Sequence, residues 1–69
     1  MDLSALGELM MGRRKQLDLR QEDIAEMSGI TTRTIYNIEE GKGNPSFKTL
    51  SKLCAILGLE ITVAIKVVN

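Results

Sequence analysis

Apolar residues recur every three or four positions through most of the chain, which is the spacing of helices with one buried face. This pattern predicts four helices, which cover residues 4–17, 21–28, 32–40 and 47–57. The positions predicted to face inward are Leu6, Leu9, Met10, Leu17, Ile24, Ala25, Met27 or Ser28, Ile35, Ile38, Phe47, Leu50, Leu53, Cys54 and Leu57. The sequence therefore predicts a mainly α-helical fold.

Capping residues support these boundaries. Ser4, Thr31 and Ser46 stand at the starts of three of the predicted helices, and each has a side-chain oxygen that can accept from a free amide of the first turn. Glycine follows the C-terminal ends of the second, third and fourth predicted helices. A residue with positive φ commonly stops a helix there. These glycines are Gly29, Gly41 and Gly58.

The last segment, residues 60–68, has a different pattern. Its β-branched residues alternate with smaller or polar ones, as in a strand with one buried face. The alternating apolar residues are Ile61, Val63, Ile65 and Val67. Ile61, Ile65 and Val68 also fit a helical stripe, so spacing alone does not decide between the two, and the β-branched composition favours a strand.

A predicted strand needs a partner for its backbone groups, and the sequence predicts no second strand in this chain. Antiparallel pairing of two copies about a two-fold axis is the simplest closed arrangement, because such an interface is self-complementary. Pairing with a different protein is the alternative. We therefore expect a homodimer sealed by Ile61, Val63, Ile65 and Val67.

Length and composition strengthen the expectation of a dimer. A core built from 69 residues supplies only about 3–5 kcal/mol without further support. One cysteine, Cys54, and no histidine leave no internal disulfide and no recognisable metal site, and we expect no cofactor. An enzyme is not expected either, because Cys54 lies on the buried stripe of its helix and no other group suggests a nucleophile or base.

Hydropathy bears on where the protein is located in the cell, and charge bears on how it could bind DNA. No apolar run approaches the roughly 20 residues that span a bilayer, and the N-terminus does not resemble a signal peptide, so a cytoplasmic protein is expected. Nine basic and nine acidic residues give a net charge of zero. Any surface for DNA must therefore arise from the arrangement of charges and not from their sum.

The second and third predicted helices are joined by a short turn that contains glycine, a geometry found both in DNA-binding helix-turn-helix units and in simple helical corners. The residue types favour the first. Ala25 is small where the helices cross, Gly29 supplies the positive φ of the turn, and Ile30, Ile35 and Ile38 fill the wedge between the helices.

The chain resembles the phage-repressor and Cro-like (XRE-type) helix-turn-helix family over residues 4–59. The matching residues are Gly7, Arg14 and Lys15, followed by LRQEDIA at 19–25, GITTRTIYNIEEG at 29–41 and NPSFKTL at 44–50. The resemblance implies a lambda-repressor-like domain of four to five helices at residues 1–59, followed by a dimerisation strand at 60–69. It also implies double-stranded DNA as the partner.

In this family, the helix equivalent to residues 32–40 enters the major groove. The resemblance makes Thr32, Arg33 and Asn37 the base-contacting residues, and Arg and Asn suit guanine and adenine. The alternative is an ordinary solvated helix face. The backbone-contacting residues that it implies are Arg20, Gln21, Thr31, Thr34, Tyr36, Lys42, Gly43 and Asn44. Arg20 is equally an ordinary surface cation, and for Tyr36 a base contact and surface packing remain open.

The resemblance further implies that Arg14 and Glu39 form a half-buried structural ion pair, with two unrelated surface charges as the alternative. One residue departs from the family, because Arg20 stands where many relatives have a serine or threonine cap. The missing cap should cost about 1 kcal/mol. Glu22 and Asp23 partly offset this loss through the helix dipole.

The predicted strand in place of a fifth helix resembles HipB-like antitoxins, in which paired C-terminal strands seal a dimer that represses its own operon and binds a toxin. Three functions therefore remain open. They are a stand-alone dimeric repressor of a palindromic operator, an antitoxin with a toxin partner, and a module that binds only protein. The first two predict recognition helices about 34 Å apart, one turn of DNA.

Overall fold

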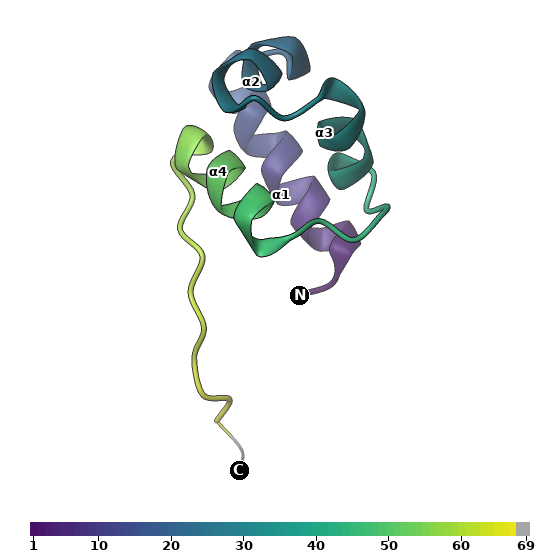
Figure 1. Ribbon diagram of the computed structural model, residues 1–69. Helices are drawn as coiled ribbons and strands as arrows, with labels where there is room; N and C mark the ends of the chain where they lie inside the picture. Colours follow the sequence, from purple (N-terminus) through teal and green to yellow (C-terminus); the bar gives the residue numbers. More distant parts are fainter. Residues whose placement is uncertain (68–69) are drawn as a thin grey trace.

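The computed structural model describes residues 1–67 and contains four helices, as the apolar pattern predicted (Figure 1). Their bounds are α1 Leu3–Gln16, α2 Gln21–Ser28, α3 Thr32–Glu39 and α4 Phe47–Leu57. Helices α1 and α2 each pack against both α3 and α4. The prediction of a mainly helical domain is confirmed. In the described part of the chain, no helix is long and apolar enough to cross a membrane.

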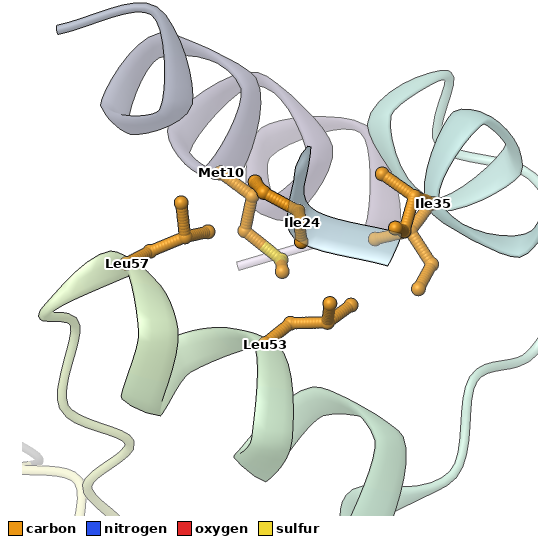
Figure 2. Packing of buried hydrophobic residues seen from close by; sticks show 6 residues of the cluster. Met10, Ile24, Ile35, Leu53 and Leu57 are labelled. Atoms are coloured by element: carbon orange, nitrogen blue, oxygen red, sulfur yellow. The ribbon is translucent and has the colours of Figure 1, made fainter. Parts of the chain in front are cut away.

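One apolar core joins all four helices. Met10, Ile24, Ile35, Leu53 and Leu57 converge on its centre (Figure 2), and all five are buried. Burying a side chain of this size contributes about 1.5–3 kcal/mol. Each helix therefore depends on the others for its stability, because none has enough apolar surface to fold alone.

Three residues predicted to face inward are exposed instead. They are Leu9, Leu17 and Phe47. The core accepts only a narrow stripe from each helix, so positions beside that stripe reach solvent. Phe47 begins α4 and Leu17 follows the end of α1, and helix ends have fewer neighbours to cover them. Of the two alternatives predicted in α2, Ser28 is half-buried and Met27 is exposed.

The helix N-termini show one incorrect prediction. Thr31 and Ser46 cap α3 and α4, accepting from the amides of Thr34 and Thr49 at 3.2 and 3.1 Å. Helix α1, in contrast, begins at Leu3, and its cap is Asp2 and not Ser4. Asp2 Oδ1 accepts from the amide of Ala5 at 2.8 Å. A carboxylate is favoured here because it also interacts with the positive end of the helix dipole.

The two candidate caps of α1 can be separated by mutation. We expect Asp2→Ala to lower the free energy of unfolding by about 1 kcal/mol, because it leaves an amide of the first turn without its partner. Ser4→Ala should change it by less than about 0.5 kcal/mol, as for a surface site inside a helix. Urea unfolding followed by circular dichroism measures both. A larger effect of Ser4→Ala would move the start of the helix to the predicted position.

Glycine ends two of the helices as predicted. Gly29 follows α2 with φ 76° and Gly58 follows α4 with φ 69°, and the amide of each donates to the helix it ends. Helix α3 ends at Glu39, one residue earlier than expected, and the predicted Gly41 follows its cap with φ 72°. Gly29 and Gly58 both turn the chain sharply, and Gly29 does so inside the α2–α3 unit.

The C-terminal segment does not form the predicted strand in the single chain. Residues 60–67 carry no regular secondary structure, and they run away from the helices as an open trace (Figure 1). Val63 and Ile65 are 96% and 95% exposed. A strand is defined by hydrogen bonds to a neighbour, and the described residues of one copy offer none. Val68, the last residue of the predicted strand, and Asn69 lie outside the described residues.

Candidate DNA-binding interface

The turn between α2 and α3 is held by side-chain and backbone bonds. The Ser28 hydroxyl donates to the carbonyl of Ile24 at 2.7 Å and accepts from the amide of Ile30 at 3.0 Å. Gly29 lies between them with positive φ. Ser28 therefore replaces the backbone partners that the end of α2 lacks, and it fixes where α3 begins.

Helix α3 has one buried and one exposed face. Ile35 and Ile38 are 2% and 4% exposed. Thr32 and Arg33, in the first turn, are exposed. Tyr36, one turn later, is also exposed, at 48%. The anchored face fixes the rotation of α3, so the residues of its other face keep a defined direction toward solvent.

A shallow hollow lies between α3 and the loop that leads to α4. It is lined by five of the predicted DNA-contacting residues, together with Ile38 and Pro45. The five are Thr34, Asn37, Lys42, Gly43 and Asn44. The amide of Lys42 donates to the carbonyl of Asn37 at 2.8 Å. The structure thus brings the end of α3 and its following loop into one surface, as a contact with bases and phosphates would require.

The two threonines at the start of α3 are linked to each other. Thr31 Oγ1 accepts from the amide of Thr34 and lies 3.1 Å from Thr34 Oγ1. Thr31 is exposed and Thr34 is half-buried. Both hydroxyls therefore serve the helix cap in the free chain, which sequence reasoning assigned to Thr31 alone.

Arg14 and Glu39 form a bidentate ion pair that joins α1 to the end of α3. Arg14 Nε and Nη2 donate to the two Glu39 carboxylate oxygens at 2.7 and 2.9 Å. Both side chains are largely buried, with 12% and 5% exposed. The hydrogen bond to Glu39 raises the pKa of Arg14 above its ordinary value. The guanidinium also donates to the carbonyl of Leu19 at 2.9 Å, which fixes the loop before α2.

Gln21 joins this network, which the sequence did not predict. Its Nε2 donates to Glu39 Oε1 at 3.0 Å, so Glu39 connects α1, α2 and α3. Gln21 was predicted to contact a phosphate, and one of the two N–H groups of its side-chain amide is already used inside the protein. One N–H group remains for that contact. A glutamine at the start of a helix gives no sign of a partner 18 residues away, so only the fold reveals this bond.

Arg20 is exposed at the N-terminus of α2 and, as predicted, its side chain does not accept a capping hydrogen bond. A direct bond partly replaces the missing cap, because Asp23 Oδ2 accepts from the Arg20 amide at 2.8 Å. Asp23 therefore acts through a direct bond as well as through the helix dipole. An acidic residue three positions after the N-cap residue is the sequence signal for this arrangement.

A family model described as "Helix-turn-helix" matches residues 10–63, which include all of α2, α3 and α4. The chain belongs to the helix-turn-helix family of DNA-binding transcriptional regulators. It is 33% identical over 63 residues to the ImmF control region 10 kDa protein of Bacillus phage phi105, a match that covers 91% of this chain and 70% of that protein.

Two further relatives carry regulator names. An uncharacterized HTH-type transcriptional regulator of Methanothermobacter thermautotrophicus is 38% identical over 52 residues, or 75% of each chain. The HTH-type transcriptional regulator PuuR of Escherichia coli is 38% identical over 58 residues, which cover 84% of this chain and 31% of PuuR. The match thus covers most of this chain but only about a third of PuuR, which is a longer regulator.

Proposed function

We propose that this helix-turn-helix protein is a dimeric repressor that binds a palindromic operator, with α3 in the major groove. The observation that carries the proposal is the division of α3 into two faces. Ile35 and Ile38 anchor the helix in the core, while Thr32 and Arg33 at its N-terminal turn are exposed. The early residues of a recognition helix are those that reach base edges in helix-turn-helix complexes.

Each side chain on this surface suits a definite contact. Arg33 can donate two hydrogen bonds to a guanine, Asn37 can pair with an adenine, and the methyl group of Thr32 can pack against a thymine. The residues that position the protein on phosphates are Arg20, Gln21, Thr31, Thr34, Tyr36, Lys42, Gly43 and Asn44. Since the net charge is zero, few phosphates are neutralised, and specific contacts must supply much of the affinity.

The two proposed functions, DNA binding and dimerisation, belong to different parts of the chain. Residues 1–59 form the DNA-binding domain, and residues 60–69 form the dimerisation segment. A two-fold axis between the segments would relate two α3 helices about 34 Å apart, so that they enter successive major grooves on one side of the DNA.

A selection of genomic DNA fragments tests the proposal. We expect wild-type protein to enrich a palindromic site, and Arg33→Ala and Asn37→Ala each to weaken binding to that site by about 10- to 100-fold. Binding to unrelated DNA should change far less. Lys15→Ala is the matched control, because it also removes one exposed cation but lies at the end of α1. Equal losses for Lys15→Ala and Arg33→Ala would contradict the base-reading role of α3.

The exposed C-terminal segment supports a second candidate, a HipB-like antitoxin that represses its own operon and neutralises a toxin. An apolar row such as Val63, Ile65 and Val67, 96%, 95% and 84% exposed, is typical of a surface that binds protein. Co-expression with the neighbouring open reading frame tests this candidate. A stable complex and relief of growth arrest would support it. A protein-only function would instead leave activity intact in Arg33→Ala.

A further inference from the structure

The C-terminal segment has two different faces if it is extended. Side chains of successive residues point to opposite sides of an extended chain. One side then carries only apolar residues, which are Leu59, Ile61, Val63, Ile65 and Val67. The other side carries Glu60, Thr62, Ala64 and Lys66. One face is thus suited to burial, and the other has one acid near its start and one base near its end.

The apolar row begins on the domain and continues beyond it. Leu59 packs against the core, and Ile61, 41% exposed, borders a hollow lined by Leu6, Leu9 and Cys54. The following apolar residues extend past the helices (Figure 1) and are almost wholly exposed. The described chain measures 44 Å in its longest dimension against 23 and 19 Å in the others. Helices of the same copy therefore do not cover the end of the row.

The alignment of two such segments is limited by their side chains. In an antiparallel pair of identical segments, an axis that passes between two residues places apolar positions opposite polar ones. An axis through a residue keeps the apolar row together. Among these axes, the one through Lys66 would place two like charges opposite each other, which is unfavourable. The axis through Ala64 leaves Lys66 opposite Thr62, without an acid. Glu60 and Lys66 lie opposite each other only when the axis passes midway between them, through residue 63.

The axis through Val63 satisfies both faces at once. On the apolar face, Leu59 is opposite the partner's Val67, and Ile61 is opposite the partner's Ile65. On the polar face, Glu60 is opposite the partner's Lys66, and symmetry repeats this pair. Directly opposed charges of opposite sign and paired β-branched residues both stabilise antiparallel strands. All the residues involved belong to the described part of the chain.

We infer that, in the proposed dimer, the register of the two antiparallel C-terminal segments is centred on Val63 and selected by two Glu60–Lys66 ion pairs. The inference rests on the proposed dimer and deepens it, since it names the partner surface and its alignment. Opposed charges of this kind make the segment recognise itself in one register and disfavour the alternatives.

Charge reversal tests the register. Glu60→Lys and Lys66→Glu should each weaken self-association about tenfold, measured as the dimer dissociation constant by sedimentation equilibrium, because both symmetric pairs become repulsive. The double variant Glu60→Lys/Lys66→Glu should recover the wild-type constant. A mixture of the two single variants should form heterodimers in preference to either homodimer. Glu26→Lys and Lys52→Glu, exposed on α2 and α4, are matched controls that should change nothing.

Val63→Asp separates the register from the dimer itself. This substitution lies outside the helices, so circular dichroism should show an unchanged fold, while two acids at the axis should abolish the dimer. If Val63→Asp gives monomers but both charge reversals behave as wild type, the proposed register is overturned and the dimer through this segment stands. If Val63→Asp remains dimeric, or the wild type is monomeric, both are overturned.

Discussion

Glu39→Ala is expected to destabilise the domain by about 3–5 kcal/mol, as does the removal of one partner from a buried ion pair. The Arg14 guanidinium would keep one hydrogen bond, to the carbonyl of Leu19, and would lose both carboxylate oxygens. Gln21 would also lose its partner. Since so small a core supplies about 3–5 kcal/mol, we expect a largely unfolded monomer at 25 °C, measured by circular dichroism and urea unfolding.

The adjacent Glu40 offers a matched control. It is exposed, so Glu40→Ala should change the free energy of unfolding by less than about 0.5 kcal/mol. The pair Arg14→Met/Glu39→Met provides a second comparison, because replacing both charges with apolar groups avoids an uncompensated charge. We expect the double variant to be more stable than either Arg14→Met or Glu39→Met. Single variants that cost under 1 kcal/mol would show that the pair behaves as a surface ion pair.

Gly7→Ala should cost about 3 kcal/mol or more through a single added methyl group. Gly7 lies where α1 crosses the end of α3, and a Cβ there would come closer than 3.0 Å to backbone atoms, with Glu39 O at 2.6 Å and Glu39 C at 2.9 Å. The carbonyl oxygen of Ile38 is also too close. Backbone atoms of a helix cannot rotate away, so the two helices must separate. Thermal and urea unfolding measure the loss.

Gly12 is the control for this prediction because it lies in the same helix. A Cβ added there meets no described atom within 4 Å. Gly12→Ala should therefore stabilise the domain by about 0.5–1 kcal/mol, the usual gain when alanine replaces glycine inside a helix. Opposite signs at Gly7 and Gly12 would establish the close approach of α1 and α3. Similar effects at both positions would contradict it.

Local chemistry explains why much of the fold could be predicted. The bounds of α2 and α4, the caps Thr31 and Ser46, and the left-handed residues Gly29 and Gly58 depend on neighbours within a few positions. Periodicity also identified the residues at the centre of the core. The family could be recognised for the same reason, since its defining turn and wedge residues lie within one short stretch of the sequence.

Predictions failed where distant residues decide the outcome. Phe47 and Leu9 have the right chemistry for a core, but the packing of four helices leaves them 68% and 49% exposed. Asp2 and Ser4 are both suitable caps, and the position where α1 begins decides between them. Periodicity detects the stripe of a helix but not how much of it its neighbours will cover.

The sequence by itself determined the helices, their turns, the family and the alternating C-terminal segment, because each follows from the spacing and chemistry of nearby residues. Only the tertiary structure decided the contacts between residues far apart in the chain. It brought Gln21 to Glu39, brought the backbone of α3 against Gly7, and left the segment after Leu59 without a neighbouring strand in the described chain. These contacts depend on how the helices cross in three dimensions, which spacing along the chain does not encode.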